Sequence, residues 1–524
     1  MSDRAKAKAQ AIALGGAPLR LAELSALAAG APARLAPEAG ERVRASRALI
    51  EDVLRRGDAV YGVNTGFGAL KSVRIGDEDV GRLQINLLRS HAAGFGPELE
   101  RGAVTLMLAL RAHSLALGAS GVRPALIEHL LAMREHDLLP VVPSRGSLGA
   151  SGDLIPLSHL ALGVIGEGEI RRGGKIAPAA EHYRAAGLAP LQLGAKEGLA
   201  LINGTQAAAA LGAVALVEAL ETLRAAHAAC ALSVEGMRGS SKPFDARVHA
   251  LRAHGGQADS AAAVRRLLTG SGILASHAGC GRVQDAYSLR CAPQVLGASI
   301  QAVRYALGVV VTEVNSVTDN PLCFADTGEV ISAGNFHGQP LAQALDFLAI
   351  GMAEVGAIAE RRSFLLLDAS KSELPPFLSD DAGLSSGLMI VQYLQAALVS
   401  ENKMLAQPAS VDSIPTSAGQ EDHVSMAMHA AVKALTLTRN VRRIVAAELL
   451  CAAQAVEFLR PLRSSEPLEA LLAELRRRVP RLEQDRRLDE DLGRLDAWIA
   501  EGGVSSIAGI AGFDGPGRGN GRKP

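Results

Sequence analysis

The stretch "GLALINGTQAAAALGAVALV", residues 198–217, carries no charged side chain, although a glutamate stands at each end of it. It is nearly long enough to cross a lipid bilayer. The polar residues Asn203, Thr205 and Gln206 inside it argue against a membrane span. A helix that is apolar on all sides is expected in the middle of a large helical bundle. We therefore interpret this stretch as a core helix.

Other long segments carry the same signal. Between about residues 200 and 310, and again between 338 and 460, apolar residues recur at helical spacing. The residues expected to share one helical face in 345–358 are Leu345, Leu348, Met352, Val355 and Ile358. Aromatic residues make up only 3% of the chain, which favours close packing of helix on helix. The sequence predicts a mainly α protein with a long central bundle.

The expected organisation along the chain has four parts. An N-terminal region, 1–200, is rich in Gly and Pro loops, and 201–465 forms the central bundle. Residues 466–510 are charge-rich and predict peripheral helices, whereas 511–524 is Gly-rich, polar and expected to be disordered. Two short hairpins are expected at 168–178 and 321–334, with turns at Gly173-Gly174 and at 326–328.

Charge and cysteine content exclude several classes of partner. The 54 basic and 54 acidic side chains cancel, so no overall field attracts nucleic acid or an anionic membrane, and a small neutral or zwitterionic partner fits better. The five cysteines are scattered without paired spacing, and the thirteen histidines show no metal-binding motif. No apolar segment of signal-peptide length follows the N-terminus. We expect a cytoplasmic protein with reduced thiols and no metal.

Three small residues, Ala150-Ser151-Gly152, lie inside "RGSLGASGDLIPLSHLA", residues 145–161. The ordinary interpretation is a helix start, since Ser and Asp before an apolar run are common there. The chemical alternative is cyclisation, in which the Gly152 nitrogen attacks the Ala150 carbonyl carbon and one water leaves. A second dehydration, at Ser151, would leave an electron-poor alkene conjugated with the new ring, an electrophile made without any external cofactor.

The surrounding sequence resembles the ammonia-lyase family that carries a 4-methylideneimidazol-5-one (MIO) group. The family signature Gly-Ser-x-Gly-Ala-Ser-Gly-Asp-Leu-x-Pro-Leu-x-His matches residues 146–159 throughout. Further similar blocks run from about residue 15 to 460 and include "YGVNTGFG", "LGAKEGLALINGTQ", "DNPL", "GNFHGQP" and "QEDHVSM". The resemblance implies an L-aspartase/fumarase-like helical bundle, MIO formed autocatalytically from Ala150-Ser151-Gly152, and a homotetramer whose active sites draw on three subunits.

The resemblance also assigns roles to single residues. Tyr61 matches the base that removes a β-proton, and Arg290 matches the group that pairs with the substrate carboxylate. Gln284 and Tyr287 would position that group, on one helical stripe with Arg290 if the segment is helical. Asn203 would meet the MIO ring oxygen or the substrate. Further assignments are Phe336 as a lining residue, and His159 and His337 as structural hydrogen-bonding residues.

The substrate is indicated by Ser90-His91 in "LLRSHAAG" and by Glu421. This combination is typical of the family members that act on histidine, since imidazole offers one donor and one acceptor nitrogen. A buried Glu opposite a phenyl ring would be costly. Three features depart from the usual pattern of the family. They are Arg89 beside Ser90-His91, Gly419 where Asn is common, and the residues "LLLDASKSE" before "LPPFL".

The expected reaction is the non-oxidative deamination of L-histidine to trans-urocanate and ammonia. In this reaction the amine or the imidazole ring adds to the electrophile, and both proposals need the same residues. The alternatives are a tyrosine or phenylalanine ammonia-lyase, an MIO-dependent 2,3-aminomutase, and a non-catalytic scaffold whose tripeptide has not cyclised.

Overall fold

The computed structural model describes residues 11–57, 60, 62–66, 74–279, 281 and 283–515. The chain divides into two compact units, each assembled from three separate segments. The first consists of 1–214, 308–345 and 408–432, and the second of 215–307, 346–407 and 433–524. The four consecutive parts expected from the sequence stay a prediction, and residues 516–524 of the expected tail lie outside the described range.

The first unit carries short helices and all of the described strands. Its helices are α1 (Leu21–Ala28), α2 (Pro37–Arg56), η2 (Asp77–Asp79), α3 (Val80–His91), α4 (Arg101–Ala116), α5 (Pro124–Glu135), α6 (Leu154–Val164), α7 (Ala179–Ala186), α8 (Glu197–Ile202) and η5 (Ser417–Gly419). Its strands are β1 (Ile12–Leu14), β2 (Ala33–Leu35), β3 (Phe95–Glu98), β4 (Leu139–Pro140), β5 (Pro143–Arg145), β6 (Glu169–Arg172), β7 (Lys175–Pro178), β8 (Leu322–Phe324) and β9 (Glu329–Ile331).

These strands form only small sheets. β1 pairs with β2 in parallel, β3 pairs with β5 antiparallel, and β4, β6 and β7 make a three-stranded sheet. Both expected hairpins are present: β6 and β7 pair Arg172 with Lys175 across the Gly-Gly turn, and β8 and β9 pair Phe324 with Glu329. The first turn supplies two glycines at positive φ, Gly173 and Gly174, and the second supplies one, Gly328, as tight hairpin turns favour.

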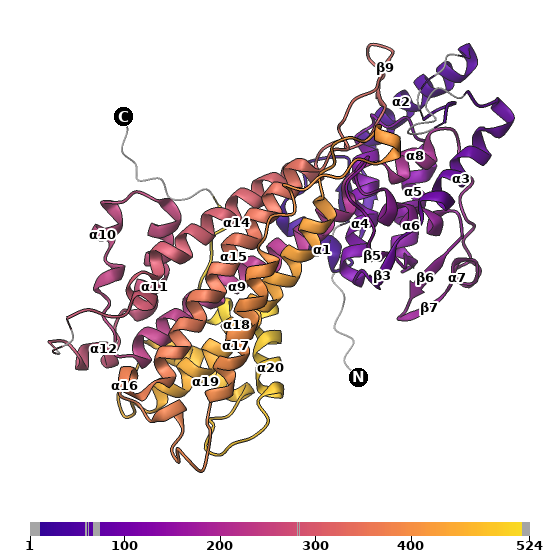
Figure 1. The fold of residues 1–524 in the computed structure, drawn as a ribbon. Coiled ribbons are helices and arrows are strands. Elements are labelled where there is room, and N and C mark those ends of the chain that lie inside the picture. The colour runs from indigo at the N-terminus through magenta and orange to yellow at the C-terminus, as the bar shows by residue number, and fades with distance from the viewer. Residues whose placement is uncertain are drawn as a thin grey trace. The chain divides into compact units, whose positions relative to one another are not determined.

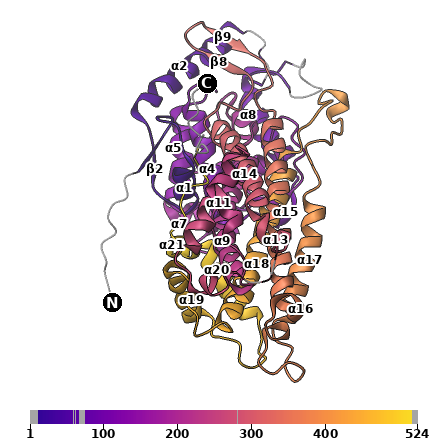
Figure 2. The same ribbon diagram turned by 90° about the vertical axis from the view of Figure 1, so that its left-hand side faces the viewer.

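Four long helices have residues in both units: α9 (Gln206–Gly236), α14 (Ala292–Val314), α15 (Gln339–Leu367) and α18 (Ala427–Glu457). The remaining helices of the second unit are η3 (Lys242–Phe244), α10 (Ala246–Ala250), α11 (Gly255–Leu268), α12 (Gly272–Ser276), α13 (Tyr287–Arg290), α16 (Ala369–Ser372), η4 (Pro376–Leu378), α17 (Met389–Leu405), α19 (Glu466–Arg478), α20 (Asp489–Ala500) and α21 (Gly503–Ile507). Figures 1 and 2 show the long helices running alongside one another.

Polar contacts inside the second unit connect these helices. Ser299 of α14 donates to the Gly351 carbonyl of α15 at 2.7 Å, and Ser233 of α9 donates to Glu448 of α18 at 2.7 Å. Gln395 of α17 donates to the Ile444 carbonyl of α18 at 2.9 Å. The apolar face expected in α15 is confirmed, because all five of its predicted residues are buried. The second unit is therefore a helical bundle with a mostly apolar interior.

Three described helices, α9, α14 and α15, are long and apolar enough to cross a membrane by length and composition. The expected core helix over 198–217 is only partly right, because the non-helical residues 203–205 separate α8 from α9. The most apolar window of α9 is 78% buried within the chain, as expected for a helix of the core. The corresponding windows are 39% buried in α14 and 61% buried in α15. These two helices therefore keep apolar surface that the single chain does not cover.

Candidate active site

The tripeptide forms a tight turn between β5 and α6. Ser151 has φ 51°, a conformation that side-chain-bearing residues rarely adopt, and Gly152 follows with φ 82°. The Gly152 N–H donates to the Gly149 carbonyl at 3.2 Å, which closes the turn. Such strain is stored at sites where the surrounding structure enforces it.

Close packing explains why the residues here are small. A Cβ atom on Gly152 would lie 2.2 Å from the Gly204 carbonyl oxygen, and one on Gly149 would lie 2.2 Å from the Ser425 hydroxyl oxygen. Neither distance is possible for a real side chain. The backbone of residues 149–152 is thus packed tightly against two other segments of the first unit.

The expected helix start is confirmed, because Asp153 is the N-cap residue of α6, but its side chain has another role. Asp153 directly precedes that helix, but its side chain makes no capping hydrogen bond to it. The carboxylate instead accepts from the Ala208 N–H at 2.8 Å, in the first turn of α9, and from the Ser147 hydroxyl at 3.4 Å. Burial raises the pKa of Asp153 to about 7.

The segment after α8 lies against the tripeptide. The Gly204 N–H donates to the Ser151 carbonyl at 3.3 Å, and the Asp153 N–H donates to the Gly204 carbonyl at 2.7 Å. Asn203, one residue earlier, donates through Nδ2 to the Asn320 carbonyl at 2.9 Å. Its Oδ1 is buried and has no hydrogen-bond partner among the described residues. Because Gly204 contacts Ser151, the preceding residue Asn203 lies close to the tripeptide.

Ser90 and His91 form the last turn of α3. The Ser90 hydroxyl donates to the Leu87 carbonyl at 3.1 Å, and His91 Nδ1 lies 2.9 Å from the same oxygen. Because a carbonyl can only accept, Nδ1 carries the proton and Nε2 is left as an acceptor. Arg89, which departs from the usual family pattern, makes a bidentate ion pair with Glu167, at 2.6 and 3.0 Å. A charged residue at this position is therefore paired within the chain.

Phe336 and Glu421 lie on two loops of the first unit that touch each other. Phe336 is half-buried, and the adjacent His337 stacks on His423 with ring centres 5.9 Å apart. Glu421 exchanges backbone hydrogen bonds with Thr416, and its Oε2 is buried without a partner in the described part of the chain.

The loop that carries Glu421 continues to the tripeptide segment. The Met426 N–H donates to the Leu148 carbonyl at 2.9 Å, two residues before Ala150. The departure at Gly419 has a backbone reason, because its φ of 85° suits either Gly or Asn.

Gln284, Tyr287 and Arg290 belong to the second unit. The Arg290 guanidinium stacks on the Tyr287 ring at 4.3 Å, and its Nε donates to the Asp285 carbonyl at 3.2 Å. Gln284 and Arg290 line a cavity of about 560 Å³ that also has the basic residues Arg238 and Lys242 in its wall. The expected common helical stripe is wrong for Gln284. The helix α13 begins only at Tyr287, and Ala286, the residue just before this helix, is extended.

Tyr61 lies outside the described residues. Its neighbour Gly62 has φ 70°, and a Cβ there would lie 2.2 Å from Leu199 of α8. The described residue after Tyr61 is thus packed against the helix that leads to Asn203.

Comparison with known proteins identifies the family. Residues 19–477 match the family model described as aromatic amino acid lyase. The chain is 52% identical over 493 residues to the histidine ammonia-lyase of Gloeobacter violaceus, covering 94% of this chain and 96% of that protein. The chain belongs to the aromatic amino acid lyase family. It is therefore an enzyme, and the resemblance expected from the sequence is confirmed.

Other members of the family agree in sequence and fold. The histidine ammonia-lyase of Anaeromyxobacter dehalogenans is 51% identical over 505 residues, which cover 94% of this chain and 99% of that protein. The crystal structure of histidine ammonia-lyase from Trypanosoma cruzi has a TM-score of 0.89 at 42% identity, covering 95% of both chains. Tyrosine aminomutase from Streptomyces globisporus has a TM-score of 0.90 at 36% identity, covering 95% of this chain and 98% of that one. The mainly α fold is thus confirmed.

Three buried charged residues of this lyase fold were missed from the sequence. Arg111 of α4 donates to the Asn203 carbonyl at 2.7 Å, and Lys196 pairs with Asp319 at 2.8 Å. Glu197 pairs with Arg123 at 2.6 Å. A signal was available, since charged residues at the border of an apolar run need partners when buried. The partners themselves lie 74 to 123 residues away in the chain.

The histidines have structural contacts. His159 accepts a hydrogen bond from the Gly94 N–H at 3.1 Å, as expected for a structural residue. Among the residues that the structure describes, no group of three or more His, Cys, Asp or Glu side chains is placed to hold a metal ion.

Proposed function

We propose that this lyase deaminates L-histidine to trans-urocanate and ammonia. The observation that carries the proposal is the closed, strained turn at Ser151, held on both sides by backbone hydrogen bonds to Gly204. The sequence identity to proteins named histidine ammonia-lyase supports the choice of substrate.

The tripeptide fits the MIO group that the family implies. Cyclisation needs a backbone that folds on itself, and the positive φ values of Ser151 and Gly152 supply that shape. The packing around Gly152 leaves no room for a side chain. Once formed from Ala150, Ser151 and Gly152 by loss of two waters, the MIO group supplies an electrophilic alkene that helps the amino group to leave. We propose that this formation is autocatalytic and needs no external cofactor.

The other residues bind the substrate and move its protons. Tyr61 takes a β-proton at its phenolic oxygen, which requires surroundings that lower its pKa. Arg290 pairs with the carboxylate through its planar guanidinium, supported by the stacked Tyr287 and by Gln284. Phe336 lines the site beside the Glu421 loop.

Recognition of the imidazole ring is assigned to Ser90, His91 and Glu421. With its Nδ1 proton donated to Leu87, His91 offers Nε2 as an acceptor for an imidazole N–H. The unpartnered Glu421 Oε2 is a second acceptor. A phenyl ring has no donor for either atom and would leave the buried carboxylate unsatisfied.

We further propose a cytoplasmic homotetramer whose sites combine residues of several subunits. Its support is apolar surface on α15 and α17 of the second unit, where seven side chains are 42 to 72% exposed. They are Phe347, Ile350, Phe364, Ile390, Tyr393, Leu394 and Met404. Burial of such a surface against further copies is a strong driving force for assembly. The free thiols of Cys230, Cys291, Cys323 and Cys451 suit a reducing compartment.

The deciding experiment is a substrate panel with the purified protein. Urocanate and ammonia from L-histidine, with much slower reaction of tyrosine and phenylalanine, support the proposal. Coumarate, cinnamate or a β-amino acid as the main product would assign the chain to tyrosine or phenylalanine chemistry instead. An intact mass that lacks the loss of two waters would remove the MIO mechanism and leave a non-catalytic scaffold.

A further inference from the structure

A buried ion pair lies close to the candidate active site. Lys196 Nζ donates to Asp319 Oδ2 at 2.8 Å, and both side chains are 0% exposed. Lys196 also has φ 67°, a strained backbone conformation for a residue with a side chain. Burying two charges is costly, so a buried pair is weak evidence for a role in stability. Its place close to the candidate active site indicates a role other than stability.

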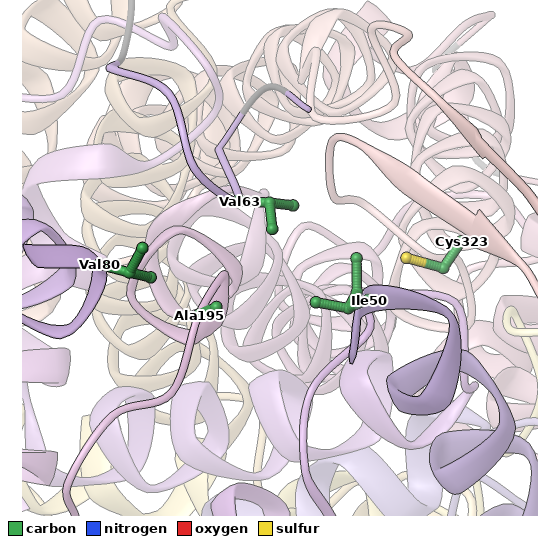
Figure 3. Close-up of a cluster of buried hydrophobic side chains, with 5 residues drawn as sticks. All are labelled: Ile50, Val63, Val80, Ala195 and Cys323. Carbon is green, nitrogen blue, oxygen red and sulfur yellow. The ribbon is translucent and has the colours of Figure 1, made fainter. Parts of the chain in front are cut away.

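A buried apolar cluster includes residues close to this pair along the chain. Ile50, Val63, Val80, Ala195 and Cys323 form a buried cluster in the first unit (Figure 3). Ala195 directly precedes Lys196, and Cys323 follows Asp319 by four residues. In surroundings with so little water, polar contacts are strong, and the loss of one partner is not compensated by solvent.

The ion pair is linked to Asn203 through Asn320. Asp319 Oδ1 accepts from the Asn320 N–H at 2.7 Å, and the Asn320 side-chain oxygen accepts from the Ala333 N–H at 2.7 Å. The Asn320 carbonyl, held in place by these contacts, accepts from Asn203 Nδ2 at 2.9 Å. The chain of contacts therefore runs from Lys196 to the Asn203 amide.

This chain of contacts sets the orientation of Asn203. A carbonyl oxygen can only accept, so the Asn203 atom that faces Asn320 must be the NH₂ group. The Asn203 backbone carbonyl is held separately by Arg111 Nη1 at 2.7 Å. Oδ1 is left buried without a partner among the described residues, and a buried acceptor calls for a donor.

We propose that the Lys196–Asp319 pair positions Asn203 so that its carbonyl oxygen accepts a hydrogen bond from the amino group of the bound amino acid. The proposal rests on the function proposed above. Asn203 adjoins Gly204, which is hydrogen-bonded to Ser151, so Oδ1 belongs to the surroundings of the tripeptide. An amino group can donate to Oδ1, whereas a ring carbonyl oxygen, the other partner considered for Asn203, cannot.

A double-mutant cycle tests the positioning role. Lys196→Met is expected to lower kcat/KM for L-histidine by about tenfold or more, and Asn203→Ala by at least as much. If Lys196 acts through Asn203, adding Lys196→Met to Asn203→Ala changes kcat/KM by less than about twofold. Equal losses in both backgrounds overturn the proposal. So does an intact mass of Lys196→Met without the loss of two waters, since Lys196 would then act in forming the prosthetic group.

Two inhibitors test the direction of the hydrogen bond. Histidinol keeps the amino group of histidine, and imidazolepropionate keeps the ring and carboxylate but lacks the amino group. Both variants are expected to weaken inhibition by histidinol about tenfold while changing that by imidazolepropionate less than about twofold. Equal weakening of both inhibitors overturns the proposal, because Asn203 would then not act on the amino group.

A second variant and a matched control complete the design. Asp319→Asn, which is nearly isosteric, replaces Lys196→Met if the latter does not fold.

The matched control is Arg362→Met, which breaks the Arg362–Glu448 pair of the second unit, whose side chains are also 0% exposed. It is expected to lower the unfolding midpoint without changing kcat/KM, and a loss like that of Lys196→Met would overturn the proposal. Wild-type protein that makes no urocanate refutes the proposed function, whereas an active wild type with an additive cycle refutes only the positioning role.

Discussion

At the scale of single residues, the carboxyl of Asp153 combines full burial with a place next to the tripeptide. Burial raises its pKa from 3.8 to about 7. Since the pKa is higher in the folded state than in the unfolded state, the protonated carboxyl contributes stability that is complete below about pH 4. That stability is lost as the pH rises through about 7.

The first prediction concerns this pH dependence. Between about pH 4 and pH 7, the free energy of unfolding should fall by up to about 4 kcal/mol more in the wild type than in Asp153→Asn, which cannot ionise. Urea unfolding of the intact protein at several pH values measures the difference. Asp52→Asn, on α2 with a side chain that is 38% exposed, is the control and should leave the wild-type slope unchanged.

The second prediction concerns Ser151. Ser151→Ala removes the hydroxyl whose loss completes the electrophile, so the chain should not lose two waters and turnover should fall at least about 10³-fold. The helical circular-dichroism signal should stay at the wild-type level, because alanine fits the turn that Ser151 occupies. Mass spectrometry and a urocanate assay measure both effects, and wild-type activity would contradict the mechanism.

The third prediction concerns substrate choice. Glu421→Gln keeps the shape of the side chain but removes its charge, and kcat/KM for histidine should fall about 10- to 100-fold, as for the loss of a charged hydrogen bond. The value for tyrosine should fall less, so the ratio of the two reports selectivity. Asp422→Asn, at the exposed neighbouring position, is the control. A constant ratio would remove Glu421 from substrate recognition.

At the scale of elements, the bundle of the second unit contains a buried ion pair between α15 and α18. Arg362 Nη2 donates to Glu448 Oε2 at 2.8 Å, and Glu448 also accepts from Ser233 of α9. Replacement of one member leaves a charge without a partner in an apolar interior, whereas replacement of both removes the charge altogether.

The fourth prediction follows from this pair. Arg362→Met should lower the free energy of unfolding by about 3–5 kcal/mol, and Arg362→Met with Glu448→Met should regain most of that loss. Denaturant titration of the two variants and of Glu448→Met alone closes the cycle. Additive losses would show that the two charges do not interact.

At the scale of the whole molecule, the uncovered apolar surface of α15 and α17 is the support for the proposed assembly of several chains. Tyr393 is 58% exposed on α17. Such residues on a single chain are unfavourable in water unless another chain covers them.

The fifth prediction tests assembly. Tyr393→Lys places a charge in the proposed interface, so the proposed tetramer should dissociate. Activity should fall with it if the sites draw on several subunits, as proposed. Sedimentation velocity and a urocanate assay at equal chain concentration measure the two effects. Ala180→Lys, at an exposed position of α7, is the control and should leave both unchanged. A fully active monomer would contradict shared sites.

The sequence by itself determined the features that depend on neighbours along the chain. Helical spacing predicted α15 and its buried face, and paired glycines predicted the β6–β7 hairpin, because both patterns are local. The order of small residues around Ser151 likewise predicted which segment forms the proposed electrophile. Helical spacing did not hold at Gln284, because Ala286 is extended and α13 begins only at Tyr287.

Only the tertiary structure decided what surrounds that segment. The Asp153 side chain accepts a hydrogen bond from α9 and does not cap the helix that follows it. The partners of Arg111 and Lys196 lie 92 and 123 residues away in the chain. Buried polar groups must find partners wherever the packed chain offers them, and no local spacing records which segments meet. The chain order thus predicted the chemistry, and packing decided how Asn203 is held near the tripeptide.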